Sequence, residues 1–348
     1  MDPLILIFLS SGLFLGWALG ANDAANVFGT AVGTKMVRFR TAAIICSIFI
    51  ILGALISGGG TTHTLGKLGA ISALPGAFMT ALSAALAVYS MTKSGLPVST
   101  SQAIVGAIIG WNLFSGSQTD ASTLTKILST WIICPVLSAI IAIILFKMHK
   151  FTSKRISIHM IMADAYTRFA LIIAGALGAY SLGANNIANV IGVFIPGEPL
   201  PALQVGTFIF SSTQQLFLLG GVAIATGVWT YSKRVMMTVG NNLGRLSANS
   251  ALIAVISHSI VLFMFASRGL EAWLAGHGLP TIPLVPVSSS QAVVGAVVGI
   301  SILQGAAGIR WSVLGKIVAG WVATPLAACF ICFIGLFFLQ NVFGLTVQ

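Results

Sequence analysis

Charged side chains are scarce in this chain, and their scarcity excludes a water-soluble globular protein. Only 7% of the 348 residues are charged and 57% are hydrophobic, with a mean hydropathy of +1.02. Soluble domains contain about 25% charged residues. The sequence therefore predicts an all-α polytopic membrane protein. A helix needs roughly 20 apolar residues to cross a bilayer. Apolar runs of about this length recur at 4–19, 41–57, 71–92, 97–114, 123–146, 166–182, 203–230, 249–267, 286–306 and 313–340.

The sequence also lacks the side-chain sets that many enzymes and metal proteins use. Its predicted spans contain one carboxylate, Asp23, and the sequence has no H-E-x-x-H zinc motif and no Ser–His pairing. The four cysteines lie in apolar spans without a nearby histidine, which indicates packing rather than redox or zinc chemistry. We therefore expect no enzymatic activity and no cofactor.

Acidic residues are especially rare, with six Asp and Glu against 17 Lys and Arg and a formal net charge of +11. A basic chain can indicate nucleic-acid binding, but here the cations gather in alternate connections between spans. They include Lys35, Arg38, Arg40, Lys147, Lys150, Lys154, Arg155 and Arg310. With the N-terminus outside, these connections face the cytoplasm, as the positive-inside rule requires. The charge therefore predicts a multi-pass protein of the cell membrane that contacts lipid and no nucleic acid.

Three motifs occur twice along the chain, in the same order. They are GANDAAN at 20–26 and GANNIAN at 183–189, PVSTSQAIVGAIIG at 97–110 and PVSSSQAVVGAVVG at 286–299, and KILSTWIICP at 126–135 and KIVAGWVATP at 316–325. This repetition predicts two structural repeats joined by a linker.

We place the first repeat at 1–146, a basic cytoplasmic loop at 147–165 and the second repeat at 166–348. If 71–92 and 97–114 form one helical hairpin, each half crosses the membrane an odd number of times, and the second repeat is inverted. Inverted repeats with broken helices and hairpins are common in secondary transporters, which bind substrate near the midplane. A gene duplication without a midplane site is the alternative.

The two asparagine-rich motifs place polar side chains inside apolar spans. Gly and Asn weaken a helix, and unwound backbone survives in a bilayer only where protein or a wet cavity satisfies it. We therefore expect helix breaks at both motifs, with their amides facing an internal site. A close-packed helix interface built from small residues is the alternative. The polar residues in question are Asn22, Asp23, Asn26, Asn185, Asn186 and Asn189.

Two ionisable side chains lie inside the predicted spans. Burying a charge in a membrane costs several kcal/mol, so Asp23 predicts a functional site. His258, in the span 249–267, fits either a proton relay or a structural histidine.

The PVSTS and PVSSS motifs predict two helix N-termini rich in hydroxyl groups. Proline stops a preceding helix and Ser or Thr caps the next one. A helix N-terminus attracts anions, so two of them could hold a tetrahedral oxyanion with neutral donors. Two ordinary caps are the alternative. The hydroxyl residues are Ser99, Thr100, Ser101, Ser288, Ser289 and Ser290.

Uptake of a dianion into a negative cell requires a coupling ion. Moving one charge across 100 mV costs about 2.3 kcal/mol, so cations must accompany the anion. Asp23 with nearby carbonyl groups could hold sodium, and Asp23 alone could hold a proton.

GANDAAN, GANNIAN and the paired PVSxSQAxVGAxxG motifs resemble the inorganic phosphate transporter (PiT) family, across both halves and in the right order. The resemblance implies inverted repeats, cation-coupled phosphate uptake, an elevator-like movement and a homodimer. It also implies that the asparagines, Asp23 and the two hydroxyl runs form the phosphate and cation sites.

The chain departs from that family at Asn186, where the second motif usually repeats the aspartate. Losing this carboxylate leaves the number of sodium ions open and makes protons an alternative. A carboxylate can accept the proton of monohydrogen phosphate, whereas sulfate has no proton to offer, so losing a carboxylate weakens the discrimination between the two anions. A sulfate permease of the same family is therefore the second candidate. A passive channel is a further alternative, although it would leave Asp23 without a task.

Overall fold

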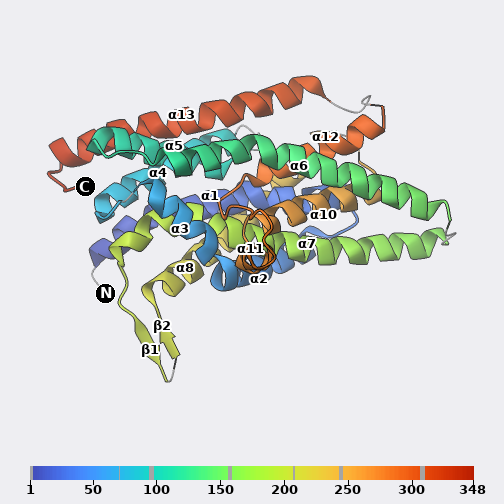
Figure 1. Ribbon diagram of the computed structural model, residues 1–348, viewed down its shortest axis with the longest axis horizontal. Helices are drawn as coiled ribbons and strands as arrows, with labels where there is room; N and C mark the ends of the chain where they lie inside the picture. Colours follow the sequence, from blue (N-terminus) through green and yellow to red (C-terminus); the bar gives the residue numbers. More distant parts are fainter. Residues whose placement is uncertain are drawn as a thin grey trace.

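The computed structural model describes residues 3–69, 71–93, 98–155, 159–206, 208–242, 246–305 and 310–348. It is an elongated bundle in which the start of α1 and the C-terminus lie at one end, and the end of α6 and the start of α7 lie at the other (Figure 1). The elements are α1 (Pro3–Gly33), α2 (Phe39–Ser57), α3 (Gly59–Leu68), α4 (Leu74–Lys93), α5 (Thr100–Ser115), α6 (Ala121–Ser153), α7 (Met160–Ile191), the 3-10 helix η1 (Gly192–Gly197), β1 (Leu203–Val205), β2 (Phe208–Phe210), α8 (Ser212–Thr230), α9 (Ser232–Asn242), α10 (Ala248–Met264), α11 (Arg268–Gly276), α12 (Ser289–Leu303) and α13 (Trp311–Asn341).

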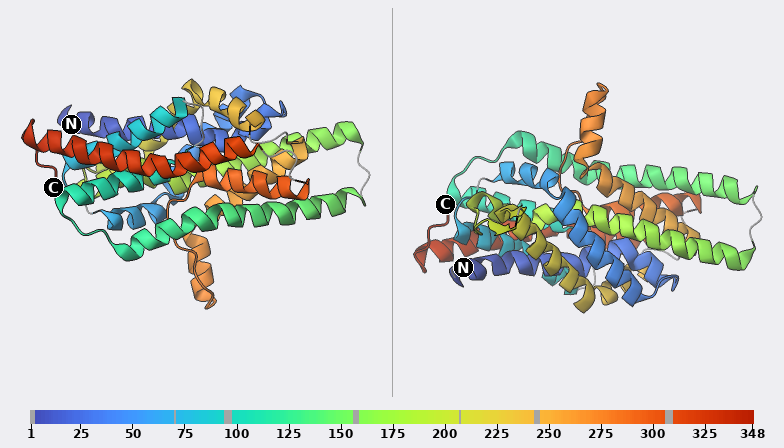
Figure 2. Two further views of the ribbon diagram at one scale, coloured as in Figure 1. Left: turned by 90° about the horizontal axis from the view of Figure 1, so that it is seen from above. Right: turned by 90° about the horizontal axis from the view of Figure 1, so that it is seen from below.

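Helices long and apolar enough to cross a membrane confirm the prediction of a multi-pass α-helical protein. Among the described residues there are six such helices, or seven if α10 and α11, which meet at a bend of 67°, count as one broken span. Helix α11 projects sideways from the bundle (Figure 2). Its exposed Trp273 and its two leucines give it an amphipathic character.

The predicted helix breaks at the two asparagine motifs are wrong. α1 continues through 20–26 and α7 continues through 183–189. The glycines there allow close packing instead: a Cβ at Gly20 would overlap the carbonyl oxygen of Ile224 in α8, and one at Gly183 would overlap that of Ile50 in α2. The small-residue interface therefore describes the backbone correctly, while the alanines of both motifs favour the helix.

The chain instead breaks before the two hydroxyl motifs. α4 ends at Lys93 and α5 begins at Thr100, while an extended segment leads from α11 to α12. Ser99 caps α5 by accepting a hydrogen bond from the Gln102 amide, and Ser288 caps α12 in the same way from the Gln291 amide. The predicted N-caps are confirmed. Pro97, the first residue of the first motif, lies outside the described residues.

Two other predictions need correction. The loop predicted at 147–165 is mostly helical, because α6 runs to Ser153 and α7 starts at Met160. That stretch contains no Gly or Pro, and Lys147 and Lys150 are favourable near a helix C-terminus. The apolar run predicted at 203–230 also begins later as a helix, because α8 starts at Ser212 and the short hairpin β1–β2 precedes it and projects from the bundle (Figure 1).

Each predicted repeat packs against helices of the other. α5 lies on α13 and α12 lies on α6, with glycines at the same motif position in both contacts. A Cβ at Gly106 would overlap the Pro325 carbonyl, and a Cβ at Gly295 would overlap the Pro135 carbonyl. In one contact α5 of the first half packs on α13 of the second, and in the other α12 of the second half packs on α6 of the first. Two repeats related by a pseudo-two-fold axis would give such a pair of equivalent contacts. The exchange brings both hydroxyl motifs to the centre.

We expect Gly295→Ala to destabilise the protein because the new methyl group meets backbone that cannot rotate away. Overpacking of this kind costs about 1–3 kcal/mol. Gly315→Ala in α13 is the matched control, since nothing lies within 4 Å of a Cβ there and alanine favours a helix. Thermal unfolding in detergent measures both variants. Equal midpoints would contradict the close contact at Gly295.

Candidate functional site

Four segments meet at the centre of the bundle: the asparagine motifs of α1 and α7 and the N-termini of α5 and α12. Each of the twelve side chains predicted for the site is at most 2% exposed. The site is therefore closed to solvent, and many of its polar groups pair with one another. The twelve are Asn22, Asp23, Asn26, Ser99, Thr100, Ser101, Asn185, Asn186, Asn189, Ser288, Ser289 and Ser290.

Asp23 lies where α1 meets both hydroxyl motifs. The Thr100 hydroxyl donates to Asp23 Oδ2 at 3.2 Å, and Asn26 Nδ2 donates to Asp23 Oδ1 at 3.4 Å. Asn26 Nδ2 also lies 3.3 Å from the Ser289 hydroxyl oxygen of α12. These contacts are longer than the roughly 2.5–2.9 Å of strong charge-assisted hydrogen bonds. The carboxylate is thus held by weak neutral donors.

Ser101 joins the second asparagine motif to the opposite hairpin. Its hydroxyl is 3.2 Å from Asn186 Oδ1 and 3.0 Å from the Val287 carbonyl oxygen, next to the second hydroxyl run. Asn189 Nδ2 donates to Ser101 at 2.9 Å and to Asn186 Oδ1 at 2.8 Å. The N-terminal end of α5 (Ser99–Ser101) is therefore in direct contact with the segment that leads into α12 (Val287–Ser290); we call these two ends the tips.

Asn22 and Asn185, at equivalent motif positions, hold the chain that leads into each tip. Asn185 Nδ2 donates to the Val285 carbonyl at 3.1 Å, and Asn185 Oδ1 accepts the Val287 amide at 2.8 Å. Asn22 Nδ2 donates to the Thr92 hydroxyl at 2.8 Å, at the end of α4. Both side chains therefore position a tip.

The six hydroxyl residues differ in how they are used. Ser99 and Ser288 cap their helices, and the Ser288 hydroxyl also lies 3.0 Å from that of Ser290. Thr100, Ser101 and Ser289 reach the asparagine motifs. The sequence pattern treats the six alike, and only the structure separates capping groups from groups that face α1 and α7.

Four side chains of the site were not among the predicted site residues. Thr92 contacts Asn22, and His258 Nε2 lies 2.9 Å from the Ser289 hydroxyl. Gln102 and Gln291 follow the hydroxyl runs at equivalent positions and are buried. The signal for the two glutamines was present, because both repeated motifs contain Gln directly after the last serine.

Several buried polar atoms at the site have no hydrogen-bond partner within the described part of the chain. They are Asn26 Oδ1, Gln102 Oε1, Asn186 Nδ2, Asn189 Oδ1, His258 Nδ1 and Gln291 Oε1. Leaving such a group unpaired costs about 1–3 kcal/mol. Most of these atoms are acceptors, so they suit a cation or a hydrogen-bond donor.

No described residue forms an ion pair with the Asp23 carboxylate. Between residues that the structure describes, the one ion pair is Arg168–Asp164 on the exposed part of α7, so no cationic side chain in those ranges lies within 4 Å of Asp23. The same ranges contain no group of three His, Cys, Asp or Glu side chains that could bind a metal ion. A sodium ion at Asp23 would therefore need amide and carbonyl oxygens as further ligands.

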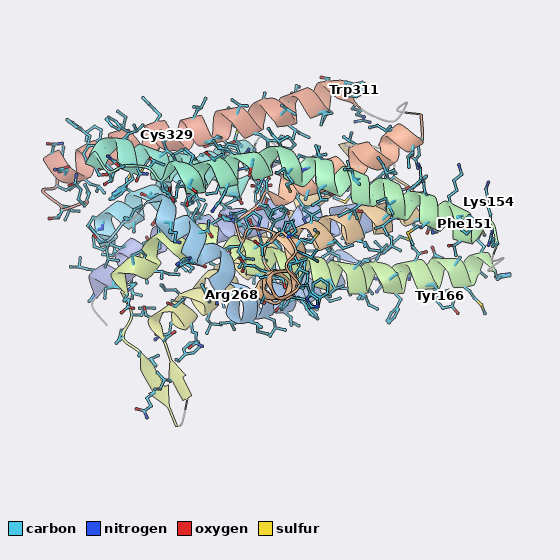
Figure 3. All side chains as sticks on the ribbon, in the orientation of Figure 1. Phe151, Lys154, Tyr166, Arg268, Trp311 and Cys329 are labelled. Atoms are coloured by element: carbon cyan, nitrogen blue, oxygen red, sulfur yellow. The ribbon has the colours of Figure 1, made fainter. Side chains whose placement is uncertain are left out.

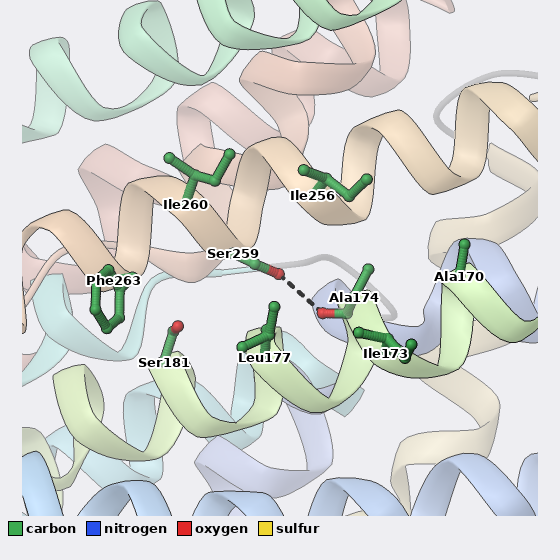
Figure 4. Close-up of a pocket in the computed structure, with 9 residues that line it drawn as sticks. All are labelled: Ala170, Ile173, Ala174, Leu177, Ser181, Ile256, Ser259, Ile260 and Phe263. Carbon is green, nitrogen blue, oxygen red and sulfur yellow. Dashed lines mark hydrogen bonds between the residues drawn. The ribbon is translucent and has the colours of Figure 1, made fainter. Parts of the chain in front are cut away.

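A separate cavity of about 540 Å³ lies between α7 and α10 (Figure 4). Its lining is apolar except for Ser181 and Ser259, and the Ser259 hydroxyl donates to the Ala174 carbonyl at 3.2 Å. It opens among exposed side chains such as Leu177 and Phe263. With so few free donors, this cavity does not suit an anion.

Comparison with known sequences matches one family across most of the chain. The model of the phosphate transporter family matches residues 19–331 and 277–346. Three similar proteins carry the name "Putative phosphate permease". That of Methanocaldococcus jannaschii is 28% identical, covering 92% of this chain and 93% of its own. That of Thermococcus kodakarensis is 26% identical with 96% and 97% covered, and that of Haemophilus influenzae is 25% identical with 98% of each covered.

Comparison with solved structures finds the same fold in a protein titled "The sodium-dependent phosphate transporter". The TM-score is 0.75, with 97% of this chain and 99% of that chain covered, at 21% sequence identity. The overall arrangement of helices is therefore shared along the whole length of both chains.

Proposed function

Because this chain belongs to the phosphate transporter family, we propose that it is a secondary active transporter that carries inorganic phosphate with sodium ions or protons across the cell membrane. The observation that carries the proposal is that the two hydroxyl-rich helix N-termini contact each other and α1 in a closed, buried site, with Thr100 of α5 bonded to Asp23 and Ser289 of α12 bonded to Asn26. The relatives are named as permeases, and the structural neighbour as a sodium-dependent transporter.

Neutral donors would hold the phosphate. Thr100, Ser101, Ser289 and Ser290 supply hydroxyl groups at the start of α5 and α12, and both helix N-termini carry partial positive charge. Each hydrogen bond to a charged group contributes about 1.5–3 kcal/mol, so several are needed to replace water around a dianion. Binding without a lysine or arginine clamp also leaves the anion free to dissociate on the other side.

Asp23 would hold the coupling cation. Its carboxylate has only long hydrogen bonds to Thr100 and Asn26, and several acceptor oxygens nearby are unpaired within the described ranges. A sodium ion would satisfy the carboxylate and some of these oxygens together, whereas a proton would neutralise the carboxylate alone. His258, 2.9 Å from Ser289, lies at the edge of the same network.

A closed site requires movement before either side can supply or receive the anion. In line with the family resemblance, the proposal includes an elevator-like movement of the two hairpins with the asparagine motifs, in a homodimer. Sulfate is the second substrate candidate, since it has the same shape and charge as monohydrogen phosphate.

Uptake of labelled phosphate into proteoliposomes tests the proposal. We expect saturable uptake that needs an imposed sodium or proton gradient, applied separately, and that excess sulfate inhibits only weakly. Strong inhibition and direct uptake of sulfate would identify a sulfate permease. Flux that persists without any cation gradient and does not saturate would contradict a coupled transporter and favour a channel.

We expect Asp23→Asn to reduce coupled uptake to background while the protein still folds, because asparagine has the same shape but cannot bind a cation by charge. Asp164→Asn is the matched control, since it removes a carboxylate from an exposed ion pair that contributes little. Uptake and elution from a sizing column measure activity and folding. Wild-type uptake in the Asp23→Asn protein would refute the role.

We expect Asn186→Asp to fold normally and to make uptake depend more steeply on sodium concentration. Asn186 Oδ1 accepts from Ser101 and Asn189, and a carboxylate keeps both contacts while adding a negative charge that favours a further cation. The double variant Asp23→Asn/Asn186→Asp keeps one carboxylate and shows whether its position matters. An unchanged sodium dependence in Asn186→Asp would contradict this role of the second motif.

A further inference from the structure

A polar cavity of about 690 Å³ lies beside the buried site, between α3, the start of α6, α11 and the extended segment that precedes α12. Lys67, Lys126 and Arg268 are among its lining residues, together with His63, and Glu271 is the acidic residue of the lining. Three cations against one carboxylate give the cavity an excess of positive charge. We define this cavity and its lining as the basic vestibule.

The positive charge of the basic vestibule is built into its walls. The Arg268 guanidinium donates to the Gly59 carbonyl at 2.6 Å, which fixes it at the start of α11 beside α3 (Figure 3). Lys67 and His63 are exposed on α3, and both also line an adjoining cavity of about 410 Å³ with Arg268. The three side chains thus line both cavities.

The basic vestibule shares a wall with the buried site. Val285 lines it, and the Val285 carbonyl accepts the hydrogen bond from Asn185. Thr64 of α3 ties the same segment down by donating to the Leu284 carbonyl at 2.6 Å. Ser288 follows Val285 by three residues, so at most about 10 Å of extended chain separates the vestibule wall from the second hydroxyl run.

In the proposed function the buried site would hold the anion with neutral donors, which act only at contact. Charged groups elsewhere would then have to attract the anion from solution. We infer that the basic vestibule is a binding site for a phosphate ion, which Lys67, Lys126 and Arg268 capture from solution before it enters the buried site. A concave surface lined by charges of one sign raises the local concentration of ions of the opposite sign and their rate of association. The inference rests on the proposed function for its substrate.

Initial rates of labelled phosphate uptake by intact cells that lack their own phosphate transporters test the vestibule. We expect K67Q/K126Q to raise KM about tenfold at low ionic strength and to leave the maximal rate unchanged. Salt at 0.1 M and above, where the screening length is about 10 Å or less, should reduce the difference. K67R/K126R should restore the wild-type KM, and E271Q should lower it.

The matched control is K147Q/K150Q, which removes the same charge from the other end of α6, near Lys154 in Figure 3. Lys147 is 21 residues from Lys126 by number, or about 30 Å along the helix. A KM for K67Q/K126Q equal to that of this control at low ionic strength would overturn the inference. A K67R/K126R protein with the raised KM would overturn it too, because the charge would then not be the cause.

Two further measurements distinguish free phosphate from a lipid headgroup and from sulfate. In proteoliposomes of phosphatidylcholine alone, the KM difference should equal that in vesicles with added phosphatidylglycerol; a difference seen only with phosphatidylglycerol would overturn free phosphate in favour of a lipid headgroup. If the wild-type protein carries sulfate instead of phosphate, the proposed substrate fails. The role of the basic vestibule is then tested by the KM for labelled sulfate in the same variants, with the same expected differences.

Discussion

The structure depends on one constraint, which is that polar side chains buried in a membrane protein need hydrogen-bond partners. Here the asparagine motifs of α1 and α7 and the hydroxyl-rich N-termini of α5 and α12 are partners of one another. Asn185 holds the chain before α12 through both its amide oxygen and its amide nitrogen. Ser101 links α5 to α7 and to the opposite tip. Each of these groups would be costly alone in a low-dielectric interior. The fold is therefore organised around the site, and replacing one of these side chains would leave its buried partners without a hydrogen bond.

Close backbone contact makes this arrangement possible. Glycines at equivalent positions let α5 lie directly on α13 and α12 on α6, so that each hairpin is held by a helix from the other half. Apolar surfaces do not drive helices together in lipid as they do in water, and small residues that permit close approach take over that role. The exchange of helices also means that neither half encloses the site by itself. Both halves must be present before the two tips can meet.

The sequence predicts the starts of α5 and α12 and their capping serines well, because proline followed by hydroxyl residues has a strong local effect on the backbone. It fails at GANDAAN and GANNIAN, where the same residues that weaken an isolated helix serve tertiary packing: Gly20 and Gly183 admit the backbone of α8 and α2. The basic residues predict a loop at 147–165, yet this stretch has no Gly or Pro and its residues extend α6 and α7. Contacts such as Asn189–Ser101 join residues 88 positions apart, and no local pattern can predict such a pair.

In the proposed mechanism, capture and retention of an anion place opposite demands on the protein, and two different sets of groups would meet them. Fixed cations such as Arg268 attract a dianion from a distance, but inside a closed site they would hold it too firmly to release it. Hydroxyl and amide groups are effective only at contact and lose their hold when the geometry changes. The cations lie at an exposed cavity and the neutral donors at the buried N-termini of α5 and α12, and Val285 contacts both places. The two tasks would then be carried out by separate groups. The short chain between Val285 and Ser288 is then the element through which movement of a tip would open one space to the other.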